Sequence, residues 1–153
     1  MDLPPAKMID MPPVWLLLFL GLAYVPVRAF PGAMLQHPVL DLLGGLAVGG
    51  GVVLMLLALM EMRRQRTTVV PHMEADTLVT GGVFARSRNP IYLGDALVLA
   101  GFVLFWGAWP SVVLVPLFMW VVADRFILPE EARLRARFGQ AFEAWAARTR
   151  RWI

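Results

Sequence analysis

Long apolar runs dominate the pattern of hydrophobic and polar positions along this chain. Four runs stand out, at about residues 12–30, 39–60, 91–109 and 111–128, and few charges interrupt them. Each run approaches the roughly 20 residues that a helix needs to cross a hydrocarbon core about 30 Å thick. Because lipid-exposed backbone must satisfy its own hydrogen bonds, we expect helices rather than strands. The pattern predicts an all-α integral membrane protein with four transmembrane helices in two hairpins.

A polar connector, residues 61–89, separates the two expected hairpins. Its segments TTVV and TLVT are rich in β-branched residues, Gly81-Gly82 marks a turn, and Phe84 supplies an aromatic anchor. This composition favours an ordered segment that folds back over the ends of the helices.

The residues after the fourth run, 129–150, form a second polar segment. Apolar residues recur there at helical spacing, with arginines between them: Leu134, Phe138, Phe142 and Trp145. The spacing predicts one amphipathic C-terminal helix that packs on the bundle or lies at the lipid interface. Together with the spans and the connector, we expect it to form a single membrane domain over residues 1–153.

The charges agree with a membrane topology and argue against nucleic acid as a partner. Only 16% of the 153 residues are charged and 59% are hydrophobic, although the net charge is +3. Twelve of the 14 Lys and Arg residues lie at position 63 or beyond: five in the connector, six after residue 128, and Arg125 near the end of the fourth run. By the positive-inside rule these segments face the cytoplasm, so four spans place both termini inside, in agreement with Lys7.

The composition also excludes several kinds of chemistry. The chain has no cysteine, which removes disulfides, thiolate metal ligands and cysteine nucleophiles. Its two histidines, His37 and His72, fall in separate predicted loops and make no metal site. No residue stands out as a general base. We therefore expect no metal site.

The stretch LVTGGVFARSRNPIYLG, residues 78–94, carries the densest polar pattern beside an apolar run. One interpretation is structural, because Pro90 suits the first turn of a helix and Asn89 can cap it. Arg88 would then only enforce topology. The other interpretation is a ligand site at the membrane surface. The residue types leave both open.

Two further features have a structural and a functional interpretation. Glu130-Glu131 follows Pro129, where acids favour a helix N-terminus, but a carboxylate at the membrane surface can also bind a cationic ligand. Glycines cluster in the second apolar run, where they either allow close helix packing or make room for a ligand. Spacing does not decide between these interpretations.

Taken together, these segments resemble the superfamily of isoprenylcysteine carboxyl methyltransferases and phospholipid methyltransferases, especially its short bacterial members. The usual pattern, LVTxGPYRxxRHPxYxG followed by a hairpin and EExxLxxxFGxxYxxY, is similar to residues 78–94 and to EEARLRARFGQAFEAW here. The resemblance covers about residues 49–152. In this chain Asn89 stands at the histidine position, and Phe84 replaces a tyrosine while keeping an aromatic stacking surface.

The resemblance implies S-adenosylmethionine as cofactor. The residues it assigns to cofactor binding are Gly49, Gly51, Leu78, Val79, Phe84, Asn89, Tyr92, Glu130 and Glu131. It also implies that Arg88, and less closely Arg125, position the substrate. Asp95 and His72 receive no role.

The expected function is methyl transfer to a lipophilic acceptor at the cytoplasmic face of a multi-pass membrane protein, in a bacterial inner membrane. An isoprenylcysteine-like carboxylate, a phospholipid amine or another small amphiphile fits this description. The alternative is a non-enzymatic membrane scaffold or lipid-binding subunit. A small transporter is disfavoured because the apolar runs contain few polar residues.

Overall fold

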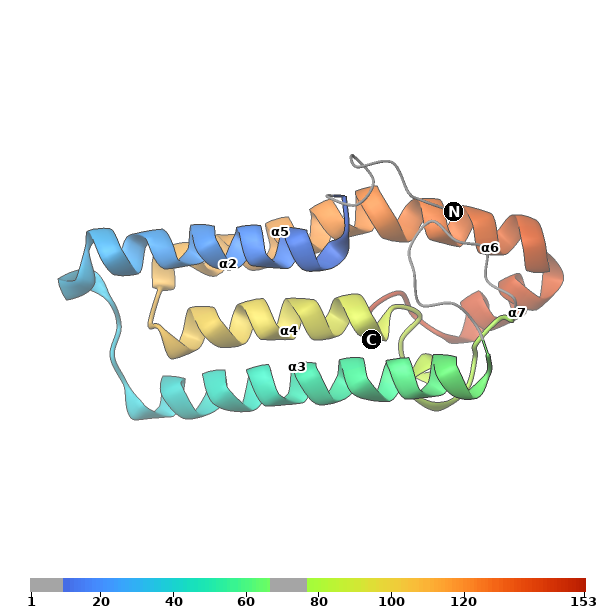
Figure 1. Ribbon diagram of the computed structural model, residues 1–153, viewed down its shortest axis with the longest axis horizontal. Helices are drawn as coiled ribbons and strands as arrows, with labels where there is room; N and C mark the ends of the chain where they lie inside the picture. The colour runs from blue at the N-terminus through green and yellow to red at the C-terminus, as the bar shows by residue number, and fades with distance from the viewer. Residues whose placement is uncertain (1–9, 67–76) are drawn as a thin grey trace.

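The computed structural model describes residues 10–66 and 77–153, and all the regular secondary structure in these ranges is helical. Four helices run side by side along the long axis of the molecule, and two more extend beyond one end (Figure 1). The aligned helices are α2 (Pro12–Ala29), α3 (Pro38–Arg64), α4 (Pro90–Phe105) and α5 (Leu114–Val122). Beyond them lie α6 (Leu128–Phe138) and α7 (Gln140–Arg148), and short 3₁₀ turns occur at Pro31–Ala33, Gly82–Ala85 and Trp109–Val113. The prediction of an all-α protein is confirmed.

Three of the described helices are long and apolar enough to cross a membrane. They comprise Pro12–Ala29, Pro38–Arg64 and the continuous helical segment Trp109–Phe138. Their outward side chains agree with a lipid environment, since Leu17 is 68% exposed, Leu46 63% and Trp120 65%. Large apolar side chains exposed along whole helices indicate a membrane-facing surface. The remaining aligned helix, α4, has only 16 residues.

The helix of the expected third span ends earlier than residue 109. Its last residue is Phe105, and Gly107 then adopts a positive φ of 59° that turns the chain. The carbonyl of Gly107 accepts a hydrogen bond of 2.9 Å from the backbone N–H of Leu35. This contact ties the α4–α5 turn to the loop between α2 and α3.

Glycines let α3 and α4 approach closely. A Cβ on Gly51 would lie 2.6 Å from the carbonyl oxygen of Gly94, and one on Gly44 would lie 2.6 Å from that of Gly101. Backbone oxygens cannot move aside without moving a helix. The glycine pairs therefore set the distance between these two antiparallel helices.

The core of the aligned helices lies between α2, α4 and α5. Phe19 meets Phe118 edge to face, with ring centroids 5.3 Å apart, and Leu99 and Val122 are completely buried beside them. Ser111 donates a 3.0 Å hydrogen bond to the carbonyl of Ala23, so its hydroxyl is satisfied within the bundle.

The fourth apolar run and the tail are not separated by a helix start at Pro129. The helix continues from α5 through a π-helical turn, Ala123–Ile127, directly into α6. Pro129 has no N–H and its ring opposes the carbonyl four residues earlier, that of Arg125. The π turn absorbs this conflict, because the N–H of Leu128 reaches back five residues to the Ala123 carbonyl.

The prediction of one continuous C-terminal helix over 129–150 is wrong. The chain breaks at Gly139, whose φ of 48° suits glycine, and α7 begins at Gln140. The break folds α7 back towards the end of α3, where Phe142 and Trp145 are buried. Packing of the tail on the bundle is thus confirmed.

We predict that Gly51→Ala lowers the midpoint of thermal unfolding in detergent, whereas Gly49→Ala does not. A Cβ at Gly51 strikes backbone of α4, while nothing lies within 4 Å of one at Gly49. Forcing the helices apart costs about 1–3 kcal/mol. Both variants gain the same helix propensity from alanine. Equal midpoints for the two variants would contradict the close glycine contact.

Candidate functional site

The candidate site lies at the end of the bundle where α3 ends and α4 begins, which we call the arginine-rich end because Arg63, Arg64, Arg86 and Arg88 cluster in its segments. The described part of the connector, residues 77–89, folds against this end as predicted. Residues 67–76 lie outside the described residues, as does His72.

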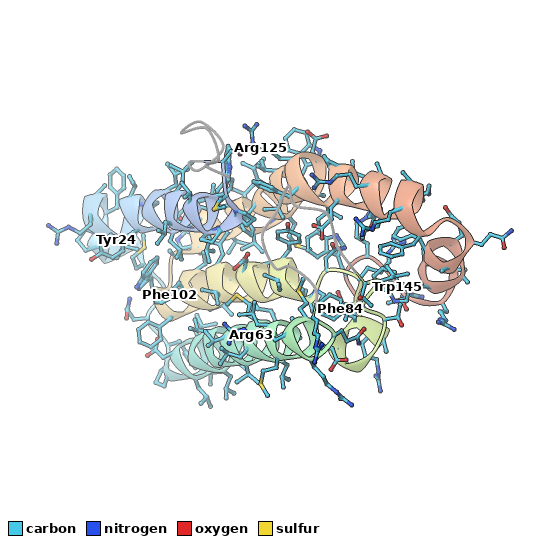
Figure 2. The ribbon with its side chains drawn as sticks, turned by 45° about the vertical axis from the view of Figure 1, so that its right-hand side comes forward. Tyr24, Arg63, Phe84, Phe102, Arg125 and Trp145 are labelled. Carbon is cyan, nitrogen blue, oxygen red and sulfur yellow. The ribbon has the colours of Figure 1, made fainter. Side chains whose placement is uncertain are left out.

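An apolar cluster holds the connector in place. Val79 and Phe84 are buried against α3 and α7, and the indole N–H of Trp145 donates a 3.1 Å hydrogen bond to the carbonyl of Phe84. Figure 2 shows Phe84 and Trp145 at the same end of the molecule. No hydrogen bond between described residues uses the backbone of Leu78 or Val79. Their peptide groups therefore have no hydrogen-bond partner among the described residues.

Glu130 of α6 contacts α4 through a hydrogen bond with Tyr92. The hydroxyl of Tyr92 donates a 3.3 Å hydrogen bond to Oε2 of Glu130, and the Tyr92 ring stacks on Phe126 with centroids 6.3 Å apart. Within the described ranges, Oε1 of Glu130 accepts no hydrogen bond. The helix-start explanation for this acid fails, because the continuous helical segment leaves no free N-terminus at Pro129.

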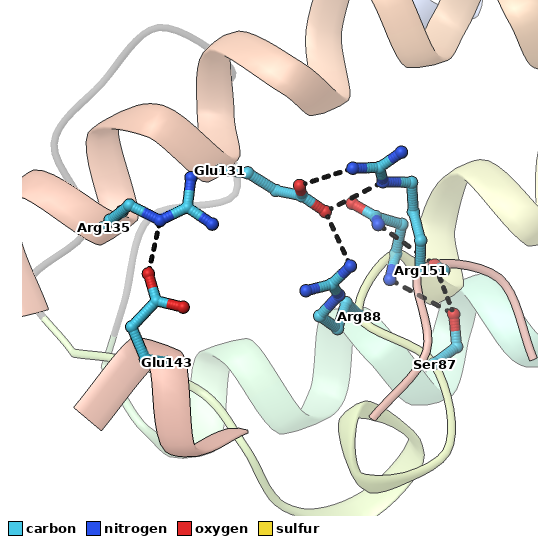
Figure 3. A network of polar contacts seen from close by, with 7 residues as sticks. Ser87, Arg88, Glu131, Arg135, Glu143 and Arg151 are labelled. Carbon is cyan, nitrogen blue, oxygen red and sulfur yellow. Dashed lines mark hydrogen bonds and ion pairs between the residues drawn. The ribbon is translucent and has the colours of Figure 1, made fainter. Parts of the chain in front are cut away.

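Glu131 is surrounded by two guanidinium groups (Figure 3). Arg151 donates to both of its oxygens, from Nε at 3.1 Å and from Nη2 at 2.8 Å, and Nη2 of Arg88 lies 3.4 Å from Oε1. The hydrogen bond with Glu131 raises the pKa of Arg151 above its usual range. Two cations sharing one carboxylate leave this network with a net positive charge.

Arg88 is not fully used by this network. Its side chain is 14% exposed, yet Nε is completely enclosed and has no hydrogen-bond partner among the described residues. A buried guanidinium N–H without a partner is costly. Within the described residues, Arg88 thus makes its ion pair with Glu131 through Nη2 and leaves Nε without a partner.

The last residues of the chain form hydrogen bonds with the segment just before α4. The backbone N–H of Arg88 donates to the Arg150 carbonyl at 3.0 Å, and the Arg151 carbonyl accepts from Nδ2 of Asn89 at 3.1 Å and from Oγ of Ser87 at 3.4 Å. We call residues 149–152 the C-terminal strap. Asn89 precedes α4 without a side-chain capping bond, so the predicted cap is wrong. Its side-chain amide donates a hydrogen bond to the C-terminal strap instead.

Comparison with known proteins places these residues in a family. The family model described as phospholipid methyltransferase matches residues 40–141, which include both motif segments and the glycines of α3. The chain belongs to the phospholipid methyltransferase family. The resemblance to the methyltransferase superfamily is thereby confirmed. Searches of curated proteins and of solved structures gave no match.

The match to this methyltransferase family ends before the strap, so Arg151 was found by the structure alone. Sequence reasoning took the arginines near the end of the chain as topological charges, and their spacing does not distinguish one from another. Only the fold brings position 151 to Glu131.

Arg125 is not part of the polar network around Glu131. Its Nε lies 2.6 Å from Oδ1 of Asp10, and its guanidinium lies over the Trp15 ring at 5.3 Å. Figure 2 places Arg125 apart from Phe84 and Trp145. The contacts of Arg125 join the π turn to the start of α2.

The two glycines that the resemblance assigns to the cofactor differ in position. Gly51 is buried against α4, whereas Gly49 is exposed and has open space beside it. Among the described residues, Gly49 makes no hydrogen bond outside its own helix, and none connects it with Tyr92 or Glu130. In the described ranges no group of three metal-ligating side chains is placed to hold a metal ion.

We predict that Arg151→Ala destabilises the protein by about 1–3 kcal/mol, the cost of removing charge-assisted hydrogen bonds from a buried carboxylate that keeps one other partner. Thermal unfolding followed by near-ultraviolet circular dichroism measures it. Arg150→Ala is the matched control, because the Arg150 side chain is exposed and only its carbonyl holds the strap. Equal shifts for the two variants would show that the Glu131 contact contributes nothing.

Proposed function

We propose that this protein transfers a methyl group from S-adenosylmethionine to a lipophilic acceptor at the cytoplasmic face of the membrane. Family membership supports methyl transfer. The observation that carries the proposal is the contact between Tyr92 and Glu130, which presents a carboxylate with one unused oxygen beside the ion pairs of Glu131 with Arg88 and Arg151.

The residues at the arginine-rich end fit the chemistry of this cofactor. S-adenosylmethionine carries a positive sulfonium and an ammonium group, a carboxylate, ribose hydroxyls and a flat purine. The unused Glu130 oxygen suits a cationic group or a hydroxyl of the cofactor. The free peptide groups of Leu78 and Val79 add neutral donors and acceptors.

When bound, S-adenosylmethionine supplies a methyl group on a positively charged sulfur. The protein's task is then alignment of donor and acceptor in a site with little water. Tyr92 holds Glu130 in position from the face of α4, and Phe126 limits the movement of the Tyr92 ring. Glu131 is engaged by two arginines, so we assign cofactor contact to Glu130 and a positioning role to Glu131.

Arg88 is the residue best suited to the acceptor. It stands one residue before Asn89, where the chain enters α4, and it shares Glu131 with Arg151. The shared carboxylate cannot neutralise both guanidiniums. A phosphate or carboxylate on an amphiphile, with its tail between the helices, would complete the charge balance and use the fork of Arg88.

The arginine-rich end is proposed to face the cytoplasm, by the positive-inside rule, with α4 as a fourth and shorter span beside α3. Cysteine replacements test the orientation. Gly32, exposed in the loop after α2, should react with an impermeant thiol reagent in intact cells, whereas Arg64, whose side chain is 82% exposed, should react only after the membrane is opened. The reverse pattern would overturn the orientation.

We predict that Glu130→Gln weakens S-adenosylmethionine binding by about tenfold or more, because it removes a charge-assisted contact without changing side-chain volume. Isothermal calorimetry on purified protein measures the affinity, and circular dichroism checks the helical content. Glu143→Gln is the control, since that carboxylate is exposed and, among the described residues, pairs only with Arg135.

Glu143→Gln should change the S-adenosylmethionine affinity less than twofold, or less than ~0.4 kcal/mol, because it removes only an exposed ion pair and such pairs contribute little. An unchanged affinity in Glu130→Gln would reduce the Tyr92 contact to a structural one. Absence of saturable S-adenosylmethionine binding by the unmodified protein would overturn the proposed function itself and favour the scaffold alternative.

A further inference from the structure

Asp95 is a buried acid that the proposed site does not use. It lies in α4 one turn after Tyr92, is 5% exposed, and has no hydrogen bond or ion pair with any residue in 10–66 or 77–153. Five residues beyond Pro90, it stands roughly 7 to 8 Å inside the bundle from the start of the helix. Carboxylates at such positions are expensive and usually serve substrate or ion paths.

The surrounding helices offer Asp95 no cation. Helix α5 carries no charge, α2 carries only Arg28 in its last turn, and the charges of α3 lie in its first and last turns. Tyr92 interacts electrostatically with Asp95 and with Glu130, and both of these partners are acids. Arg133 of α6 acts on Tyr92 and on Glu130 but not on Asp95, so no described cation neutralises this carboxylate.

Asp95 nevertheless remains reachable. Among the fully enclosed side-chain nitrogens and oxygens of the described residues, only Nε of Arg88 lacks a hydrogen bond. The unpartnered oxygens of Asp95 are therefore not fully enclosed. A metal ion is a poor occupant, because no group of three ligating side chains exists among the described residues. A single carboxylate instead suits one organic cation.

We propose that Asp95 binds the cationic nitrogen of an amine-bearing acceptor and accepts its proton. This inference rests on the proposed function and supplies the general base that the sequence does not reveal. The helix places Asp95 on the membrane side of Tyr92, and residues three apart in a helix are neighbours. An acceptor that enters between the helices would thus present its nitrogen close to the Tyr92–Glu130 contact.

One ammonium N–H bond breaks and its proton passes to a carboxylate oxygen of Asp95, which leaves the nitrogen with a lone pair. That lone pair forms the new bond to the methyl carbon of a sulfonium donor, while the carbon–sulfur bond breaks and its electrons stay on sulfur. The methylated nitrogen carries the positive charge, and Asp95 later releases its proton to water.

The first test measures acceptor binding without the cofactor. Short-chain phosphatidylethanolamine and phosphatidylglycerol are titrated into purified protein in detergent and followed by calorimetry. Asp95→Asn should weaken phosphatidylethanolamine binding about tenfold, the worth of one charge-assisted contact. Phosphatidylglycerol affinity should not change. Asp124→Asn, at an exposed acid of the π turn, is the matched control and should bind both lipids normally.

The second test measures labelled methyl transfer to phosphatidylethanolamine. Asp95→Asn should lose about 100-fold at neutral pH, a typical contribution of general base catalysis, while keeping its S-adenosylmethionine affinity. The deficit should shrink as pH rises, because more acceptor then arrives as the neutral amine. A purely structural role for Asp95 would not produce that pH dependence.

The outcomes separate this inference from the function on which it rests. Unchanged phosphatidylethanolamine binding in Asp95→Asn overturns the role of Asp95, whether or not methyl transfer is detected. Transfer to a prenylcysteine carboxylate but not to an amine overturns it too, and leaves the proposed function intact. Absence of S-adenosylmethionine binding by the unmodified protein overturns the proposed function. The phosphatidylethanolamine titration then still decides whether Asp95 binds the amine.

Discussion

The shared ion pair of Glu131 is the interaction on which the arginine-rich end depends. It connects α6, the start of α4 and the C-terminal strap, three segments that are far apart in the sequence. The carboxylate is almost fully buried, and such a group is stable only when it is paired. Since Glu130 is its neighbour in the helix, the pairing of Glu131 also fixes where Glu130 meets Tyr92.

The π turn explains how the two acids reach these partners. A turn with bonds that reach back five residues adds one residue to the helix and changes the direction in which later side chains leave it. The turn Ala123–Ile127 lies just before Pro129, where an α-helical ladder would clash with the proline ring. Local backbone chemistry and the placement of Glu130 and Glu131 are therefore linked, and the helix stays continuous from the bundle into the polar end.

The sequence predicted the features that depend on local pattern. Apolar runs indicated the helices, and the arrangement of Asn89, Pro90 and Tyr92 before a later Glu pair indicated the family that the match to residues 40–141 confirms. The break at Gly139 was missed because an amphipathic spacing of Leu134, Phe138 and Phe142 continues across a single glycine. Helical periodicity alone does not show where a chain turns back.

The sequence did not predict the long-range contacts, because they depend on how the folded chain brings distant residues together. Arg151 lies among several arginines of similar spacing, and only the folded tail brings it to Glu131. The same holds for Asn89, whose local role as a cap was plausible but whose amide bonds the Arg151 carbonyl instead. Asp95 could be noticed as an acid in an apolar run, whereas its lack of any partner in the described part of the chain became evident only in three dimensions.

We propose that the cofactor binds at the arginine-rich end, between the start of α4 and the acids of α6. Photochemical attachment of radiolabelled S-adenosylmethionine to the purified protein, followed by peptide mapping, tests it most directly. We expect label within residues 78–92 or 130–134, and we expect excess S-adenosylhomocysteine to suppress it. Label confined to α2 or to the turn between α4 and α5, or label that the competitor does not displace, would contradict it.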